Sequence, residues 1–319
     1  MVDQMAIKME GWLEWSLISR SGIIVASGEQ HNLILNQGLD YCFQRTSGLL
    51  DIDTFAVVGT GSTAPAVGQT GLVAEVARTS NSITQSQTRL SNYEFSLVRE
   101  REFDFAQANG NLTEWGFSPV ATVGGNLAVR ELFRDAGGNP ITITKTSSQK
   151  LRLKYTRRIQ FGPTAAAAFG FNITNLGAVS GNYIAAPDAN NVYTLLLGMN
   201  QLIGLGSGSV NTPSKSAVSA QLRDAAMSVS PWAGGSIVGT SGSVTAAAYI
   251  AGTFTRSYDC QFATGEGNGN SFGLYINSDG YAVNGNTLPV VGFRFAASIT
   301  KTNLQTLSFT GLSLSLGRA

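Results

Sequence analysis

Two stretches, Ile143–Gly162 (ITKTSSQKLRLKYTRRIQFG) and Ile299–Gly317 (ITKTNLQTLSFTGLSLSLG), share one layout and decide the fold class. Both begin with ITKT, carry glutamine at the seventh place and leucine at the ninth, and end in an alternating run that closes on glycine. Alternation with a period of two is the pattern of a half-buried β-strand that turns one face to a core. The chain therefore contains the same strand-forming segment twice.

The repeat extends upstream of these two segments. Phe103–Phe117 aligns with Cys260–Leu274 at an offset of 157 residues, whereas the ITKT segments are 156 residues apart. Still further upstream, Val58–Pro65 resembles Leu205–Pro213. Three matches in the same order predict a tandem duplication, and the repeat is long enough to be a whole domain rather than a solenoid unit.

The domain boundary is expected near Gly162 and Pro163, where a Gly-Pro pair followed by four alanines interrupts the strand pattern. We therefore expect two tandem all-β domains of β-sandwich, jelly-roll-like type, residues 1–162 and 163–319. Only Asn36–Gln44 has the spacing of a helix.

Turn signals separate the alternating runs at the spacing of strands and tight turns. They are Asn109-Gly110, Gly137-Gly138-Asn139-Pro140, Asp279-Gly280 and Asn284-Gly285.

Charge predicts one strand pairing. Glu100 and Glu102 share a face of the strand Leu97–Phe105, and Arg152 and Lys154 share a face of their own strand. In the second copy most of the acids and both bases are lost together, which is expected of cross-strand ion pairs. We therefore predict that these two strands are neighbours.

Composition limits the classes of function. Charged residues make up 13% of the 319 residues, there are 37 glycines, and the net charge is +1. Few charges and many glycines are typical of short strands and tight turns. A net charge near zero attracts neither nucleic acid nor an anionic membrane, so neither is expected as a partner. No stretch approaches the ~18 uninterrupted apolar residues of a membrane helix.

The charges are unevenly distributed. Residues 1–162 carry 15 basic and 15 acidic side chains, whereas residues 163–319 carry 6 and 5. Sparse charge is typical of surfaces that other subunits cover, because Lys and Glu are depleted there. A solvated surface of Ser, Thr and Asn is an equally weighted alternative.

The two cysteines, Cys42 and Cys260, fall at non-matching places of the repeat. We expect both to be reduced and buried, in keeping with assembly in a reducing cytoplasm. The N-terminal residues MVDQMAIKMEGW contain acids and lack the apolar core of a signal peptide.

The sequence offers few catalytic candidates. The only histidine, His31, lies in a polar, turn-like stretch without an evident partner, so we expect it at the surface. One histidine excludes sites with several imidazoles, and neither CxxC nor HExxH occurs, so no metal site is expected. Gly59–Thr63 lacks the ending of a phosphate loop, and Gly265–Asn270 has one acid where a calcium loop needs several. Both are interpreted as turns, and no cofactor is expected.

Glu100 and Glu102 could form a glycosidase pair, because carboxylates two residues apart on a strand lie roughly 7 Å apart. The neighbouring Arg99 and Arg101, and the loss of the pair in the second copy, favour a salt-bridged strand face instead. We therefore expect no enzymatic activity.

A basic cluster could contact a phosphate backbone. It consists of Arg152, Lys154, Arg157 and Arg158. Its charges alternate along a strand, and the first domain is neutral overall, so structural pairing is the favoured interpretation.

The order of short signals between residues 30 and 161 resembles a recurring type of tailed-bacteriophage virion protein. The signals are Asn32–Gly38, Val58–Pro65, Leu72 with Glu75 and Arg78, Phe105, Ala108–Phe117, Gly125–Arg130, and Ile143–Lys145 leading into Leu151–Tyr155. The second copy departs from this order, with Ser271 aligned to Glu114 and Leu288-Pro-Val-Val in place of the Leu-Ala-Val-Arg segment.

The resemblance implies a non-enzymatic structural subunit of the virion, at the tail, collar, baseplate or fibre attachment, assembled in several copies in the host cytoplasm. Its partners would be copies of itself and other virion proteins. A head-decoration or cement protein is one alternative. Another is a receptor-binding protein, for which Trp232 is the best candidate contact with a host glycan or protein.

Overall fold

The computed structural model describes residues 5–45, 48–173, 176–186, 194–204, 218–225, 236–283 and 286–319. The helices are α1 (Asn36–Gln44), α2 (Gly48–Asp51) and α3 (Thr194–Gly204). The strands up to residue 162 are β1 (Met5–Ser19), β2 (Ile24–His31), β3 (Leu33–Ile34), β4 (Phe55–Gly59), β5 (Glu75–Thr79), β6 (Ser82–Arg89), β7 (Glu94–Phe103), β8 (Gly110–Leu112), β9 (Glu114–Ser118), β10 (Val129–Leu132), β11 (Ile143–Lys145) and β12 (Gln149–Gly162). The later strands are β13 (Ala167–Ile173), β14 (Gly177–Ala185), β15 (Val218–Arg223), β16 (Gly242–Ala246), β17 (Thr255–Phe262), β18 (Gly269–Val283), β19 (Asn286–Lys301) and β20 (Leu307–Arg318).

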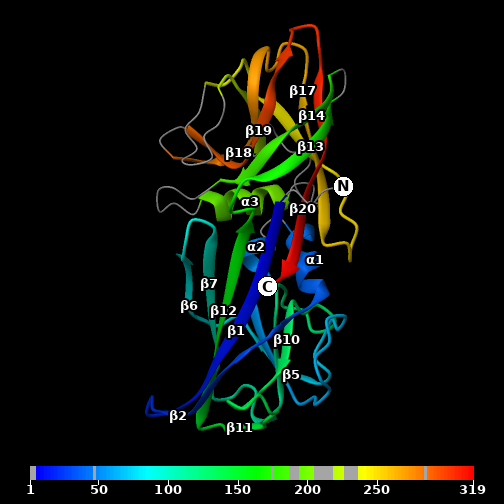
Figure 1. Cartoon of the computed structure of the whole chain (residues 1–319). Coiled ribbons are helices and arrows are strands. Elements are labelled where there is room, and N and C mark those ends of the chain that lie inside the picture. The colour runs from blue at the N-terminus through cyan, green and yellow to red at the C-terminus, as the bar shows by residue number, and fades with distance from the viewer. Residues whose placement is uncertain are drawn as a thin grey trace.

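The second half of the chain, after residue 162, contains a closed antiparallel barrel (Figure 1). The strand order is β13-β14-β19-β18-β15-β16-β17-β20, and pairing of Ile173 with Phe309 joins β20 back to β13. The all-β class is thus confirmed, whereas this half is a barrel where we predicted a sandwich. Alternating side chains are common to both architectures, and only the meeting of the first and last strands distinguishes them.

In the first half, residues 5–162, the strands neighbour one another in the same order as in the barrel. Two of these strands are bent, so that each is shared between two sheets. One sheet contains β2, β1, β12, β7 and β6, and the other contains β3, β10, β9, β4 and β5. The chain changes sheet at Asn32, between β2 and β3, and at Ser80 and Asn81, between β5 and β6. The two sheets pack face to face, and the rings of Phe117 and Tyr155 stack with centroids 4.9 Å apart.

The predicted neighbours β7 and β12 are confirmed as an antiparallel pair, with Glu102 opposite Arg152 and Glu100 opposite Lys154. The corresponding strands of the second half, β17 and β20, also pair. Leu151 lies opposite Phe103, and Leu307 lies opposite Phe262. Hence Phe103 corresponds to Phe262, and the offset here is two residues more than the sequence alignment indicated.

A pair of lysine-centred turns supports this corrected alignment. Lys145 Nζ donates to the carbonyl of Asp104 and to Asn109, both within 3.0 Å. Lys301 Nζ donates to the carbonyl of Ala263 at 2.9 Å and to Asn268 at 3.1 Å. The stretch GEGNGN contains Gly-Asn twice, at 267 and at 269, so the sequence allows two alignments. The structure matches Gly110-Asn111 with Gly269-Asn270, whereas the sequence alignment matched it with Gly267-Asn268.

The halves share one core. The C-terminal residues of β20, Leu314–Arg318, run parallel to β1, with Met5 opposite Leu314. One sheet therefore continues through both halves. Tyr249 Oη donates to Asp40 at 2.5 Å, and its ring stacks on Phe43 with centroids 4.6 Å apart. β12 ends at Gly162, where the domain boundary was predicted, and the division into domains 1–162 and 163–319 stays a prediction.

Local predictions had mixed outcomes. Helix α1 has the predicted bounds, whereas α2 and α3 were missed, and Asp279-Gly280 lies inside β18 rather than in a turn. Cys42 and Cys260 are free and buried, as predicted. Residues 205–213, Trp232 and Asn284-Gly285, which carried other predictions, lie outside the described residues. Within the described part, no helix has the length and apolar character to cross a membrane.

Candidate functional site

The outer face of the first sheet is a lattice of ion pairs. Glu102 accepts hydrogen bonds from Lys150 Nζ and Arg152 Nη2, both at 2.8 Å. Glu100 lies 3.6 Å from Arg152. Burial by itself would raise the pKa of Glu102, but the hydrogen bonds and charges of Lys150 and Arg152 outweigh burial and lower it. The acid of a glycosidase needs a raised pKa. The lowered pKa of Glu102 therefore favours the structural interpretation, a salt-bridged strand face.

Lys154 contacts Glu14 at 2.8 Å, although Glu100 is its backbone partner in the sheet. A hollow of about 430 Å³ lies over these ion pairs. It is lined by Glu14, Trp15, Ser16, Ile24, Ser27, Gly28, Glu29, Glu100, Arg152 and Lys154. Its cations, Arg152 and Lys154, already contact carboxylates, so the hollow has no cation set apart for an anionic ligand.

The predicted basic cluster is divided between the two faces of β12. Arg158 is on the outer face, where it contacts Glu94 at 2.9 Å and Glu10 at 3.1 Å. Arg157 is fully buried, donates to the carbonyl of Leu49 at 2.8 Å and lies 3.3 Å from Asp53. Arg157 therefore holds α2 against the sheet. Its inward position follows the alternation from Leu151, which was the available sequence signal.

His31 ends the edge strand β2 instead of lying in a turn, and its side chain is exposed, as predicted. It lies opposite Trp12 in the sheet, and Arg158 stacks over the Trp12 ring at 5.2 Å. No Ser, Thr or Cys accompanies His31 in the hollow that it lines with Glu10, Trp12, Glu29, Gln30 and Arg158.

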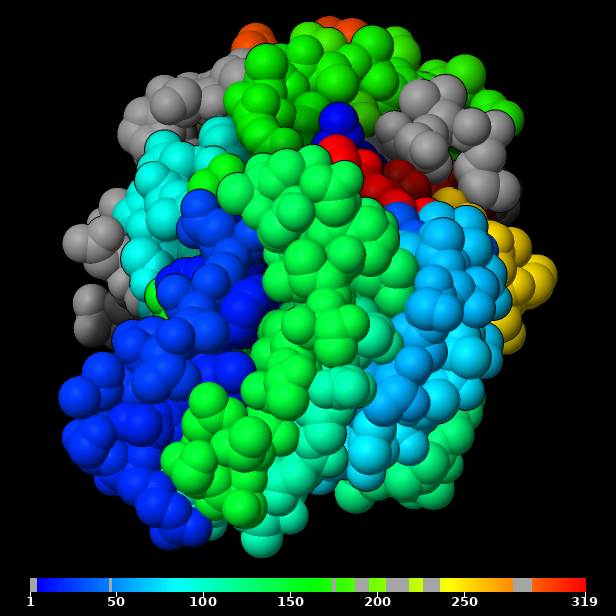
Figure 2. Space-filling view, turned by 90° about the horizontal axis from the view of Figure 1, so that it is seen from below, coloured from blue at the N-terminus to red at the C-terminus, as the bar shows by residue number. Residues whose placement is uncertain are grey.

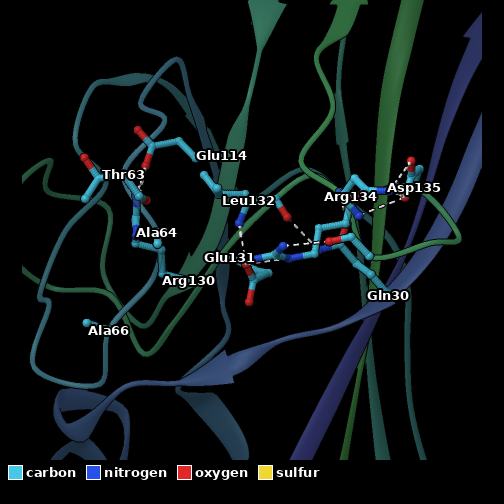
Figure 3. Close-up of polar contacts among 12 residues, drawn as sticks. Gln30, Thr63, Ala64, Ala66, Glu114, Arg130, Glu131, Leu132, Arg134 and Asp135 are labelled. Atoms are coloured by element: carbon cyan, nitrogen blue, oxygen red, sulfur yellow. Dashed lines mark hydrogen bonds and ion pairs between the residues drawn. The ribbon is translucent and has the colours of Figure 1, made fainter.

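The most distinctive polar group of the molecule is the buried pair Glu114 and Arg130, on adjacent strands β9 and β10 (Figure 3). Both side chains are fully buried, and Arg130 Nη2 lies 2.8 Å from Glu114 Oε2. Arg130 also donates to the carbonyl of Thr63 at 2.9 Å and to Gln69 at 2.7 Å. A pair placed on two rigid strands thus reaches into the loop that follows β4.

Glu114 holds both ends of that loop. Its carboxylate accepts the backbone N–H groups of Gly61 and Ala74 at 2.9 Å and of Val73 at 3.1 Å. A Cβ on Gly61 would lie 2.5 Å from Glu114 Oε1, so only glycine permits this approach. Burial by itself would raise the pKa of Glu114, but the hydrogen bonds from Ala74, Arg130, Val73 and Gly61 lower it.

Arg78 fixes a second loop beside the first. Its Nη1 donates to Ser118 at 3.0 Å, to the carbonyl of Val120 at 2.6 Å and to Asn126 at 2.9 Å. Its Nε contacts Glu75 at 3.0 Å. We call residues 60–74 and 119–126 the loop platform, because buried ions hold both segments in place.

The surface of the loop platform is hollowed and carries two exposed valines. A hollow of about 630 Å³ lies between Gly68–Val73, Glu75 and Val123–Gly125. Val73 is 56% exposed and Val123 is 67% exposed. In Figure 2 the light-blue segment at the right-hand side belongs to this region. Rigid support beneath exposed valines is typical of a protein-binding surface.

A second polar cluster joins β10 to the β2 strand (Figure 3). Gln30 accepts the backbone N–H of Arg134 at 2.8 Å and donates to the carbonyl of Leu132 at 2.6 Å. Arg134 contacts Glu131 at 2.9 Å. These contacts fix the β1–β2 hairpin relative to the strands that carry Glu114 and Arg130.

In the described part of the second half, glycines occupy the two positions that correspond to the buried pair. In the corrected alignment Glu114 corresponds to Gly273, not to Ser271. Arg130 pairs with Gly116 in its sheet, and the equivalent pairing in the barrel joins Gly292 to Tyr275. Glu114 and Arg130 both belong to the signals that carry the resemblance, but the sequence assigns neither of them a role.

Among the residues described, no three His, Cys, Asp or Glu side chains are grouped so that they could hold a metal ion. Comparison of the chain with protein-family models, with curated proteins and with solved structures finds no match.

Proposed function

We propose that the chain is a non-catalytic structural subunit of a tailed-bacteriophage virion that works in several copies. The observation that carries the proposal is the Glu114–Arg130 pair, which holds a surface loop in one shape. Burying an ion pair is costly and adds little to the stability of a fold. A buried pair beneath a loop is therefore expected where the contacts made by that loop have to be precise.

The resemblance of the sequence to virion proteins supports the same proposal. Its signals include Glu75, Arg78, Glu114 and Arg130, and these four side chains are the ones that fix the loop platform. If the virion proteins share a function that depends on one surface, the sequence signals that they have in common are expected to lie together at that surface.

The electrostatics also support a structural role. Glu102 and Glu114 both have a lowered pKa, so each is held as an ionised partner of cations. A lowered pKa disfavours the role of proton donor that a polysaccharide hydrolase requires.

Mass spectrometry of purified virions of the phage that encodes the chain tests the proposal most directly. The chain should be present in a fixed ratio to the other structural proteins after density-gradient purification. Labelling with an antibody fragment should then mark one place on the particle by electron microscopy. Purified particles that lack the chain would refute the proposal.

Variants of the loop platform test the role of that surface. Val73→Asp and Val123→Asp should reduce incorporation into particles by about tenfold or more, because a buried carboxylate opposes docking. The control is Leu304→Asp, at a side chain that is 85% exposed in the second half. Equal incorporation of all three variants would remove the loop platform from the proposal.

A further inference from the structure

Strand β6 (Ser82–Arg89) leaves the edge of a large sheet open. It is the last strand in the 13-stranded order and pairs with β7 on one side (Figure 1). No other strand of the described chain pairs with it. Residues Ser82 to Ser86 are all exposed. The edge therefore offers a strand-length template for another chain.

Between Thr84 and Thr88 the strand lacks the usual protection of an edge, whereas a bulge between Ser82 and Thr84 and the charge of Arg89 lie at its two ends. Ser82 to Thr88 reads SITQSQT, without a charged residue, proline or glycine. Natural edge strands are normally protected by charges, proline or bulges, because an open edge promotes association. Ile83 on this strand is 42% exposed. An uncharged, exposed edge is expected where a second strand adds to the sheet.

The hydrogen-bond ladder shows which backbone groups point outward. Leu90 N–H donates to the carbonyl of Glu94 at 2.8 Å. Bonded and non-bonded pairs alternate in an antiparallel ladder, and Gln85 is an odd number of residues from Leu90. Gln85, opposite Arg99, therefore directs its backbone N–H and C=O away from β7.

We propose that β6 pairs antiparallel with β6 of a second copy of this chain, with the two-fold axis at Gln85. The two Gln85 residues then exchange backbone hydrogen bonds, since both direct their N–H and C=O outward. The inference rests on the proposed function in one respect, namely that copies of the chain assemble.

The sequence of β6 complements itself about this axis. Thr84 lies opposite Ser86 of the second copy, within the part of β6 that pairs regularly with β7. Cross-strand hydroxyl pairs of this kind stabilise antiparallel sheets. The charge of Arg89 lies opposite Asn81, so no like charges meet. A two-fold contact is also closed, which leaves no edge for further growth.

A charge exchange at the axis tests the proposal in solution. Sedimentation equilibrium of the purified full-length chain should show a dimer. Gln85→Lys and Gln85→Glu should each weaken dimerisation by more than about tenfold, because like charges then lie directly opposite. An equal mixture of the two variants should form a mixed dimer of near wild-type affinity. The control Thr245→Lys places a charge at an exposed site on β16, which is paired on both sides.

Three results would overturn the proposal: a monomeric wild-type chain, homodimers that persist in both charge variants, or a mixture that fails to associate. Circular dichroism of each variant separates lost association from lost folding. The experiment needs no particles, so its failure leaves the virion proposal to be decided by the composition of purified particles.

Discussion

The two halves of the molecule share a strand order and one lysine-centred turn but differ in how their loops are fixed. Lys145 and Lys301 make matching bonds to a carbonyl and an asparagine. Ala108 and Gly267, which correspond in the two turns, both have positive φ angles, 54° and 60°. The buried Glu114–Arg130 pair occurs in the first half, and glycine replaces Glu114 in the second.

This difference separates two uses of buried charge. The lysine turns hold the strand framework together, which both halves need. The Glu114–Arg130 pair holds a surface loop of the first half, and glycine occupies both corresponding positions of the second half, 273 and 292. Among the described residues, the buried carboxyl side chains (Asp53, Glu102, Glu114 and Glu131) all lie in the first half. The halves should therefore respond differently to mutation and to acid.

The largest effect is expected from Glu114→Ala. Removing one partner leaves Arg130 buried without its counter-charge, which should lower the free energy of unfolding by about 3–5 kcal/mol. Urea unfolding measures the loss. The control Glu14→Ala breaks the pair with Lys154, in which Glu14 is 44% exposed, and should cost less than about 1 kcal/mol. Equal losses in the two variants would contradict the contrast between buried and exposed pairs.

Acid should loosen the first half before the second. The pKa values of Glu102 and Glu114 are lowered in the folded chain from an ordinary 4.5, so the unfolded chain binds protons more readily. Their stabilisation is fully present above pH 4.5 and is lost as the pH falls through the lowered pKa values.

Hydrogen exchange measured between pH 6 and pH 3, corrected for the intrinsic rate, tests this order. Residues 60–74 should lose protection at a higher pH than the strands of the barrel. The variant Glu114→Gln should abolish most of the pH dependence in that loop. Simultaneous loss of protection in both halves would show that they open as one unit.

Lys145→Met and Lys301→Met should have similar, intermediate effects. Each substitution keeps most of the side-chain stem but removes charge-assisted hydrogen bonds from a buried ammonium group to a carbonyl and an amide, which costs about 1–3 kcal/mol. Thermal unfolding measures both. A difference of more than about 1.5 kcal/mol between the two variants would show that the turns are not equivalent.

The smallest effect is expected at the contact between the halves. Tyr249→Phe removes the hydrogen bond to Asp40 and should cost about 1 kcal/mol, because the stack on Phe43 remains. Asp40→Ala should cost more, since Gly252 N–H then loses its acceptor as well. Differential scanning calorimetry measures both changes. The reverse order would contradict the assigned contacts.

Most local features of the fold could be predicted from the sequence. Alternation predicted the strands that became β7, β12 and β20, and compensating charges predicted that β7 and β12 are neighbours. The spacing of Leu39 and Phe43 predicted α1. Helix α3 was missed because TLLLGMNQLIG is apolar on most sides and has no clear period.

The candidate site was less accessible from sequence. Glu114 and Arg130 are 16 residues apart and are brought together by strand pairing, whereas Gly61 and Ala74 reach them from another loop. No local pattern encodes such a meeting, because each residue alone also fits an ordinary strand or turn. The self-complementary sequence of β6 was visible from the start, but its exposure at a sheet edge was not.

By itself, the sequence determined that this chain is built from strands and that one strand-forming segment occurs twice, because alternation and repetition are properties of neighbouring residues. Closure of the barrel by Ile173 and Phe309, the two-residue correction of the repeat, and the burial of Glu114 beside Arg130 were decided only by the tertiary structure. These features depend on contacts between distant residues, and such contacts form only when the whole sheet curls and packs.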